Sequence, residues 1–305
     1  MALPDRCPLC SAGSELQNVV TAHVYGAKAM GHAFFHCCGC DVRYQYPRLD
    51  PDDEAHFYAA EFEGFMEGRA GRQGGWRGAE EHIHANEQTR VRRLRYLAPM
   101  LTPASQLLEV GCSSGFMLLP LVEAGHVCVG IEPSGVFRDF LKAKGLRIFG
   151  SLDEMTDSIP SLRFDTILHF FVMEHIADPR SFLLSQLELL KPGGKIIFEI
   201  PNVADALYSV MDIPAFERFY WSIAHAWYFS EDALHYLLKQ IGRPYQVLRD
   251  QRYDLSNHLV WARDGRPGGL GRFTDFLGRD LENEYRSTLI RIGKCDTLIG
   301  VISNE

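Results

Sequence analysis

The sequence lacks three features that would direct it to a membrane, to secretion or to nucleic acid. Its longest apolar stretch, residues 116–131, is interrupted by Glu123, Gly125 and His126, so no run reaches the roughly 18 residues of a membrane span. The first ten residues have no basic start followed by an apolar segment, as a secretory leader would. The formal net charge is −8, whereas a polyanion-binding surface needs clustered lysine and arginine. We therefore expect a cytoplasmic protein with neither a membrane nor a nucleic acid as its partner.

The composition also lacks the bias of disordered or fibrous chains. Hydrophobic residues make up 46% and charged residues 23%, which are ordinary values for a chain that buries a core. The 305 residues exceed what one core usually holds. The length therefore allows two domains, or one domain with an appendage.

Cysteine is concentrated near the start of the chain. Cys7 and Cys10 form one C-x2-C pair, and Cys37 and Cys40 form a second after 26 intervening residues. Two such pairs can place four thiolates tetrahedrally around zinc, whereas two disulfides are disfavoured in a reducing cytosol and a redox pair would need a βαβ context. We expect one structural zinc per chain, with Cys38 and His36 as less favoured substitute ligands.

Glycine and arginine mark the segment that follows. Residues 50–60 are predicted as a short acidic helix, and residues 64–78 carry six glycines and three arginines, which is typical of a mobile loop. Residues 79–97 read as a polar helix. Its arginines (Arg90, Arg92, Arg93 and Arg95) fit a solvated face better than an anion site. His82 and His84 are expected on an exposed face of that helix.

From residue 105 short apolar runs alternate with helical segments. This alternation predicts right-handed crossovers and a parallel sheet with helices on both faces, whose ligands bind at the carboxyl ends of the strands. The predicted strands are 106–110, 126–131, 146–149, 164–171 and 195–200, and the predicted helices are about 115–124, 134–144, 152–158 and 179–190.

Two motifs follow the first two of these strands. Gly111 and Gly115 lie in the loop after the first strand, where they allow a ligand to approach the backbone closely. Glu132 follows the second strand, 23 residues after Glu109, and can accept hydrogen bonds from a ribose diol. Residues 111–115 also match the G-x-S-x-G elbow of hydrolases, but no later Asp and His stand in hydrolase order. Together the motifs indicate a cofactor that carries a nucleoside.

At these motifs the chain resembles the class I S-adenosylmethionine-dependent methyltransferases. The glycine loop EVGCSSG, the segments FDTIL and EHIADP, the turn LKPGG and residues 225–242 resemble ordered motifs of that family, over about residues 80–262. The resemblance implies an α/β Rossmann-like sheet, mostly parallel with an antiparallel last strand. Serine at position 113, where many members have glycine, still fits a tight loop.

The resemblance also implies the residues that bind S-adenosylmethionine. Those expected at the methionine end are Glu109, Gly111, Cys112, Gly115 and Phe116. Those expected at the nucleoside are Glu132, Pro133 and Ser134 for the ribose, and Ser151 and Leu152 for the adenine. His169 and Phe170 are expected to close the sulfonium side as an apolar wall, since a cationic sulfonium benefits from aromatic faces and from exclusion of water.

Methyl transfer to a hydroxyl also needs a base that removes a proton, and a histidine is the natural candidate at neutral pH. His225 precedes a predicted helix and is favoured marginally as the base, with a hydrogen bond to the backbone at the start of the helix as its alternative role. His175 follows the fourth strand beside Glu174, and for this pair a structural role in the loop is favoured over catalysis.

The cysteine module followed by this domain resembles methyltransferases of sugars, nucleotide sugars and secondary metabolites. We expect O-methylation of a small hydroxylated acceptor. The alternatives are C-methylation of a ketosugar, a zinc-ribbon rRNA or protein methyltransferase, and a non-catalytic binding module. The acidic charge weighs against RNA, although Arg69, Arg72, Arg77 and the arginines of residues 90–95 would suit a phosphate or the diphosphate of a nucleotide-linked substrate.

The predicted organisation has four parts: a zinc-binding subdomain (1–60), a glycine-rich loop with a linker helix (61–98), the S-adenosylmethionine-binding domain (99–263) and a C-terminal segment (264–305). Residues 253–263 are predicted as the antiparallel closing strand, 273–292 as a helix and 296–303 as a returning strand. The C-terminal segment either completes the domain or forms a homodimer contact.

Overall fold

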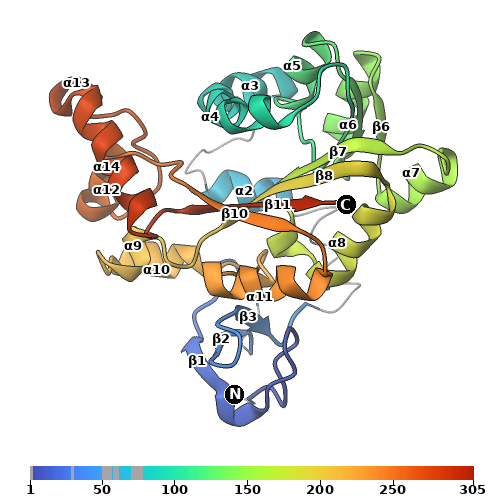
Figure 1. Cartoon of the computed structure of the whole chain (residues 1–305). Coiled ribbons are helices and arrows are strands. Elements are labelled where there is room, and N and C mark those ends of the chain that lie inside the picture. The colour runs from blue at the N-terminus through green and yellow to red at the C-terminus, as the bar shows by residue number, and fades with distance from the viewer. Residues whose placement is uncertain (1–2, 29–30, 50–56, 58–61, 70–77) are drawn as a thin grey trace.

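A seven-stranded sheet forms the centre of the computed structural model, which describes residues 3–28, 31–49, 57, 62–69 and 78–305 (Figure 1). The strand order is β10-β11-β8-β7-β4-β5-β6. The strands β4 to β8 run parallel, whereas β11 pairs antiparallel with both β8 and β10. The bounds are β4 (Gln106–Val110), β5 (Val127–Ile131), β6 (Arg147–Phe149), β7 (Phe164–Phe170), β8 (Leu190–Pro201), β10 (Tyr245–Asp250) and β11 (Thr297–Ser303). The predicted Rossmann-like α/β sheet is confirmed.

Helices cover both faces of this sheet. One face packs against α3 (Ala79–Ala85), α4 (Glu87–Leu97), α5 (Leu118–Glu123) and α6 (Gly135–Ala143). The other packs against α7 (Leu152–Ser158), α8 (Pro179–Glu188) and α11 (Glu231–Ile241). Leu107 and Leu108, adjacent in β4, belong to opposite cores because successive strand residues point to opposite faces. The sheet is therefore apolar on both sides, as a parallel sheet requires.

Local capping explains where three of these helices begin. The side chains of Ser151, Asp178 and Ser230 each accept a hydrogen bond from the backbone N–H three residues further on. These bonds satisfy donors that have no partner within the helix. The predicted helix bounds in this region, including 152–158, therefore agree closely with the structure.

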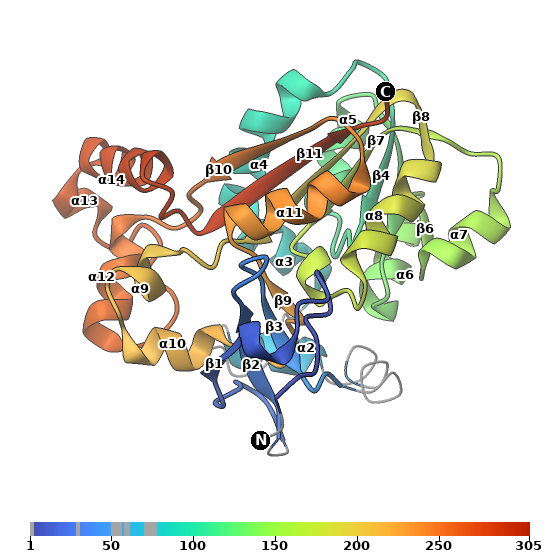
Figure 2. The same cartoon turned by 60° about the horizontal axis from the view of Figure 1, so that its bottom comes forward.

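The N-terminal residues form a second, four-stranded sheet beneath the first (Figure 2). Its order is β1 (Gln17–Thr21), β2 (Ala33–Cys37), β3 (Arg43–Tyr46) and β9 (Trp227–Tyr228). The pairs Arg43↔Tyr228 and Tyr44↔Trp227 join β3 to β9. The sheet of the N-terminal module is thus completed by a strand that lies about 180 residues later in the chain, outside the predicted subdomain boundary at residue 60.

Residues 253–263 do not form the predicted closing strand. They lie mostly in α12 (Leu255–Asp264), which Asp254 caps by accepting from the Asn257 N–H and which ends at Gly265 with φ 62°. The apolar residues of this segment pack as one face of a helix, with Val260 and Trp261 buried. The antiparallel pairing is supplied instead by β11, so the C-terminal segment completes the seven-stranded sheet.

The prediction of a glycine-rich loop over residues 64–78 is also partly wrong. Residues up to 69 belong to α2 (Phe62–Arg69), whose Phe65 ring packs against Tyr25 and Phe57. Aromatic packing evidently outweighs the low helix propensity of its two glycines. The helix predicted at 50–60 lies outside the described residues, apart from Phe57.

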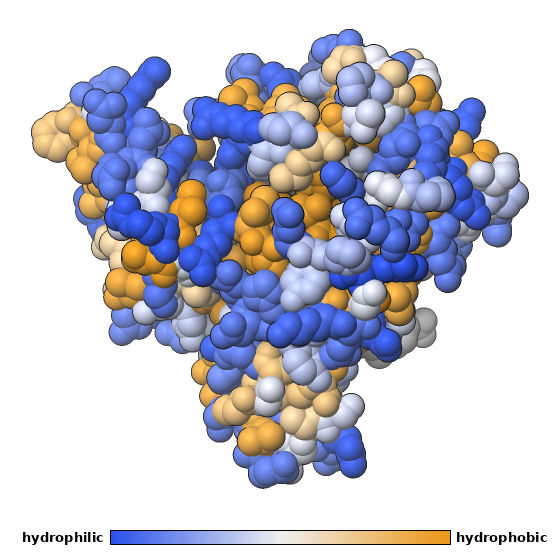
Figure 3. All heavy atoms as spheres, in the orientation of Figure 1, coloured by the Kyte–Doolittle hydropathy of each residue, from blue (hydrophilic) through white to orange (hydrophobic). Residues whose placement is uncertain are grey.

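The C-terminal helices form a lobe at one end of the molecule. It contains α12, α13 (Thr274–Leu277) and α14 (Arg279–Arg291), with the short α9 (Ala206–Ser209) and α10 (Pro214–Tyr220) beneath. A notch separates this lobe from α3 and α4 in the space-filling view (Figure 3). Among the described residues, no helix is both long and apolar enough to cross a bilayer.

Candidate active site

The glycine loop after β4 turns tightly against the neighbouring loop. Gly111 and Gly115 have φ values of 73° and 78°, and a Cβ on Gly111 would lie 2.6 Å from Val172 Cγ2. The backbone N–H groups of Gly111 and Cys112 both donate to the carbonyl of Ile131, at 2.9 and 3.0 Å. Glycine is required at position 111 both by its conformation and by this close approach.

Glu132 connects this loop to the end of β5. Its Oε2 accepts from the Ser113 N–H at 2.6 Å, and its Oε1 accepts from the Ser134 N–H at 2.8 Å. Ser134 in turn precedes α6 as its N-cap. The two carboxylate oxygens thus hold the backbone of the glycine loop and of the start of α6. The predicted ribose-binding acid therefore lies directly against the predicted methionine-binding loop.

The next strand brings Ser151 and Leu152 to the same edge of the sheet. The Glu132 N–H donates to the Phe149 carbonyl at 2.9 Å, which joins the ends of β5 and β6. Ser151 itself caps α7 by accepting from the Glu154 N–H at 3.1 Å. The carboxyl ends of β4, β5 and β6 thus gather the residues predicted for the methionine, ribose and adenine ends.

Glu109 is buried beneath the loop near the Arg93 guanidinium. Burial raises the pKa of Glu109 to about 8, while the charge of Arg93 acts in the opposite direction. Its Oε2 makes no hydrogen bond within the structure. A buried carboxyl oxygen without a partner is costly, and a cationic or N–H-donating ligand beside it would remove that cost.

The two residues predicted to close the sulfonium side do not meet. His169 points to the α8 face of the sheet, where its ring stacks on Phe198 with 4.9 Å between centroids and is fully buried. Phe170 points to the α4 face, where the Arg93 guanidinium lies 4.1 Å from the centroid of the Phe170 ring. Alternation along β7 separates the two side chains, so His169 belongs to the core and the joint wall is not formed.

His82 was expected on an exposed helix face, and that expectation is wrong. Its Nδ1 lies 2.8 Å from the Ser114 hydroxyl of the glycine loop, and its ring packs against Phe116 and Phe137 at 5.8 and 5.3 Å. Burial lowers the pKa of His82 to about 4, so the ring is neutral at pH 7. No local pattern marks this residue, because its hydrogen bond spans 32 positions. His84 is exposed as expected.

The arginines of α4 do not form the expected solvated face. Arg92 Nη2 lies 2.7 Å from Glu199 Oε1, and Arg93 Nε donates to Glu199 Oε2 at 2.8 Å. Tyr96 donates to the same carboxylate, and Arg92 also pairs with Asp250. Glu199 in β8 is fully buried. These two arginines neutralise an interior carboxylate, and only Arg95 is exposed.

The predicted catalytic residues lie together at the end of β7. One ligand-type atom from each of Glu174, His175 and His225 lies within 4.8 Å of the others. The two imidazole rings meet edge to face with 4.8 Å between centroids. The Glu174 carbonyl accepts from the Ala226 N–H at 2.8 Å, which holds the 171–175 loop against the segment before β9.

The two histidines differ in their hydrogen bonds. His175 Nδ1 lies 2.7 Å from the Ala224 carbonyl, so it braces the two segments. His225 Nδ1 is buried without a hydrogen-bond partner within the structure. Burial, the neighbouring His175 and the charges of Arg69 and Arg252 lower the pKa of His225 well below its usual value. His225 is consequently a neutral ring with an available nitrogen.

The four cysteines predicted to bind zinc converge in the N-terminal module. Cys7 Sγ lies 3.8 Å from Cys40 Sγ, Cys10 Sγ lies 3.5 Å from Cys37 Sγ, and all four sulfurs lie within 4.8 Å of one another. Tetrahedral zinc with bonds of about 2.3 Å would separate sulfurs by about 3.8 Å, so the cluster fits the metal. Cys38 is exposed, and His36 bonds to Asp41 at 2.7 Å. Neither of the two belongs to the cluster.

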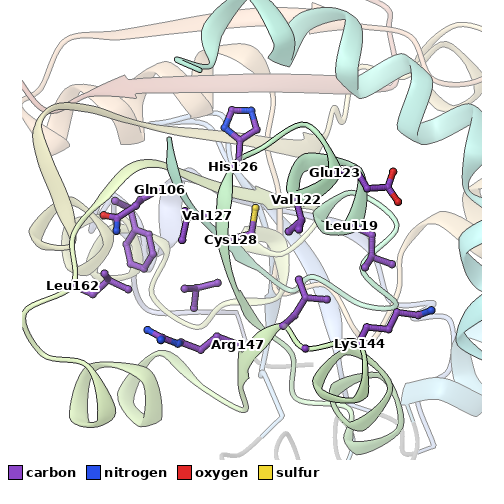
Figure 4. A pocket seen from close by; sticks show the side chains of 14 residues that line it. Gln106, Leu119, Val122, Glu123, His126, Val127, Cys128, Lys144, Arg147 and Leu162 are labelled. Carbon is purple, nitrogen blue, oxygen red and sulfur yellow. The ribbon is translucent and has the colours of Figure 1, made fainter. Parts of the chain in front are cut away.

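A hollow of about 580 Å³ lies at the opposite edge of the sheet (Figure 4). It is lined by residues at the amino ends of strands, including Gln106, Val127 and Arg147, with Glu123 and Lys144 from the neighbouring helices. In open α/β sheets, ligands bind at the carboxyl ends of the parallel strands instead. The motifs meet at that other edge, away from this hollow.

The chain matches a known protein family over more than half its length. Residues 81–243 match the Methyltransf_23 family, described as a methyltransferase domain. A solved S-adenosylmethionine-dependent methyltransferase from Archaeoglobus fulgidus has a similar fold, with a TM-score of 0.51 and 15% identity. That similarity covers 80% of this chain and all of the other.

Two curated relatives are named ubiquinone biosynthesis O-methyltransferase. The protein from Cereibacter sphaeroides is 29% identical over 154 residues, covering 48% of this chain and 62% of the relative. The protein from Ruegeria pomeroyi is 31% identical over 150 residues, covering 45% and 59%. The chain thus spans about three fifths of the length of the curated relatives it matches.

Proposed function

The chain belongs to the Methyltransf_23 family of methyltransferase domains, and from that membership we propose that it transfers a methyl group from S-adenosylmethionine to a hydroxyl of a small acceptor. The observation that carries the proposal is the adjacency of two groups of residues. The glycine loop with Glu132 would bind the nucleoside, and the Phe171–His175 loop links that edge of the sheet to His225. The names of the curated relatives support oxygen as the methylated atom.

The residues proposed to bind the cofactor would act by position and by charge. The Glu132 carboxylate would accept from the ribose hydroxyls while its backbone contacts hold the loop. Glu109, Gly111, Cys112, Gly115 and Phe116 would surround the methionine part, and Ser151 and Leu152 would flank the base. When bound, S-adenosylmethionine supplies a methyl group activated by a positively charged sulfur. His82, which reaches Ser114, would cover this loop from α3.

His225 would act as the general base. Its low pKa keeps the imidazole neutral at pH 7, so its free nitrogen can take the acceptor's hydroxyl proton while the oxygen forms its bond to the methyl carbon. The carbon–sulfur bond breaks as the carbon–oxygen bond forms, leaving a methyl ether, S-adenosylhomocysteine and a protonated His225. His175 would position His225 through its bond to the Ala224 carbonyl. Glu174, buried beside both rings, keeps its own proton at neutral pH, and its carboxyl oxygen would accept a hydrogen bond from the protonated His225.

We further propose that Cys7, Cys10, Cys37 and Cys40 hold one structural zinc ion. Four thiolates fill the coordination shell of zinc and leave no position for a substrate. The metal would therefore stabilise the N-terminal sheet without taking part in the reaction.

Two matched variants test the proposed function. His225→Ala should lower turnover at least about 100-fold, the lower range for a general base, while S-adenosylhomocysteine binds as in the wild type. Glu132→Ala should instead weaken that binding about 100-fold or more, because the ribose acceptor and two loop contacts are lost together. Calorimetry measures binding, and release of S-adenosylhomocysteine measures turnover across sugars, nucleotide sugars and phenols.

The wild-type protein provides the decisive control. Absence of S-adenosylhomocysteine binding would overturn the proposal. A product methylated on carbon, identified by NMR, would replace O-methylation with C-methylation.

A further inference from the structure

The guanidinium groups of Arg69 and Arg252 make cation–π contacts near the candidate base. Among the described residues, neither Arg69 nor Arg252 takes part in an ion pair, in contrast to Arg92 and Arg93, which share Glu199. The Arg69 guanidinium lies 4.1 Å from the centroid of Phe219 and 5.4 Å from that of Tyr25. The Arg252 guanidinium lies 4.4 Å from the centroids of both Phe171 and Tyr253.

Each arginine is anchored on one of the two segments that carry the proposed catalytic residues. Arg252 lies on Phe171, which begins the loop that continues to Glu174 and His175. Arg69 lies on Tyr25, whose N–H donates to the Trp221 carbonyl at 2.7 Å, four residues before His225. The charges of both guanidiniums act on His225, where they add to the effect of burial in lowering its pKa. Phe171 and Tyr25 thus place the two cations on the two segments that carry the proposed catalytic residues.

The chemistry of these arginines fits an anion. A guanidinium that lies flat on a ring keeps its N–H edge available, and that edge matches the two oxygens of a phosphate or a carboxylate. Both side chains are half-buried, and Arg252 Nε is buried without a hydrogen-bond partner in the structure. Asp296 and Glu199 offset part of the charge of Arg252, whereas burial and the charge of Arg252 lower the pKa of Arg69. A bound anion would stabilise the Arg69 cation.

We propose that the acceptor carries a phosphate or carboxylate group, which Arg69 and Arg252 bind so that its hydroxyl is presented to His225. This inference rests on the proposed function and names the substrate class for the same site. The anionic group serves only to bind the acceptor to the enzyme. This group is not altered by the reaction. The acidic chain as a whole repels anions, so the two arginines provide local selectivity for this group.

A divalent cation is the competing occupant. Glu174, His175 and His225 lie close enough together to share a metal ion. Two guanidiniums beside them raise the local potential and oppose a further double positive charge. The site therefore favours an anion over a metal.

Binding of simple anions tests the inference without a known acceptor. Pyrophosphate and malonate are titrated separately by calorimetry into the full chain saturated with S-adenosylhomocysteine. At least one should bind, and Arg69→Met and Arg252→Met should each weaken that binding about tenfold or more, as expected for a lost charged hydrogen bond. Arg95→Met, on the exposed side of α4, should bind like the wild type. Preference for pyrophosphate identifies a phosphate acceptor, and preference for malonate identifies a carboxylate.

Three results would overturn the inference. These are no binding of either anion, equal binding by the methionine variants, or tight binding of Mn²⁺ that His225→Ala removes and Arg69→Met does not. Arg69→Lys and Arg252→Lys keep the positive charge and serve as controls for misfolding of the methionine variants. The lysine variants should retain part of the affinity for the anion. If S-adenosylhomocysteine binds but the anions do not, only this inference fails. If S-adenosylhomocysteine itself does not bind, the proposed function fails.

Discussion

At the scale of single residues, the site is distinguished by buried carboxyl groups. Burial raises the pKa values of Glu109 and Glu174 to about 8. Such groups are mostly protonated at neutral pH, so they can donate as well as accept hydrogen bonds. Glu174 lies against the two histidines, where its protonation state sets the charge around the proposed base.

Glu174 also makes the stability of the protein depend on pH. Its pKa is raised from 4.5 to about 8, so between these values the unfolded chain ionises while the folded chain keeps its proton. The folded state therefore loses relative stability as the pH rises through this window. Glu174→Gln does not titrate, so its melting temperature should rise relative to the wild type from pH 5 to pH 8 and then level off. Thermal melts of both proteins measure this difference.

The exposed Glu123 provides the control for that experiment. Glu123→Gln should follow the wild type at every pH. A difference between Glu174→Gln and the wild type that stays constant with pH would contradict the raised pKa.

At the scale of elements, α4 is attached to the sheet by charge. Arg92, Arg93 and Tyr96 all reach the buried Glu199 of β8, and Arg93 also covers Phe170 at the end of β7. The helix thereby lies beside the edge of the sheet where the cofactor is proposed to bind. The arginine pattern of 90–95 could not reveal this, because the partner carboxylate lies about a hundred residues away and ion pairing depends on distance in space.

Removing one arginine should leave part of this carboxylate uncompensated. We expect Arg93→Met to lower the free energy of unfolding by about 3 kcal/mol, the low end for a broken buried pair because Arg92 and Tyr96 remain. Urea unfolding measures the change. The double variant Arg93→Met/Glu199→Gln should recover part of the loss, whereas Arg95→Met should change stability by less than about 0.5 kcal/mol. Equal effects of Arg93→Met and Arg95→Met would show that the pair does not contribute.

At the scale of the whole molecule, the cysteine module and the methyltransferase domain share a sheet. Strand β9 pairs with β3 and lies two residues after His225, and Cys7, Cys40 and Tyr44 join the same core as α8 and α11. In the proposed function, the module would therefore line one side of the acceptor site. The homodimer contact considered for the C-terminal segment stays a prediction, with Phe276 exposed on α13.

Loss of the proposed zinc ion should accordingly reduce the order of the segment around β9, on the acceptor side. Cys40→Ser should reduce the zinc content from one per chain towards none, and should increase amide hydrogen exchange across residues 221–229, because β9 loses an ordered partner. Binding of S-adenosylhomocysteine should change by less than about twofold, since the glycine loop lies in the other sheet. Cys38→Ser, whose thiol is outside the cluster, is the matched control. Unchanged exchange at 221–229 in zinc-free protein would contradict this coupling.

The sequence by itself determined the features that depend on neighbours in the chain. The five parallel strands, their helices, the glycine loop, Glu132 and the four-cysteine set could all be read from local spacing and alternation. Tertiary structure alone decided the features that depend on distant partners. It made α12 a helix in place of a strand and added β9 to the N-terminal sheet. It also placed His169 in the core, His82 against the glycine loop, and Arg92 and Arg93 against the buried Glu199. A charged or aromatic side chain acquires its role from what lies within a few ångströms, and backbone pattern does not encode that distance.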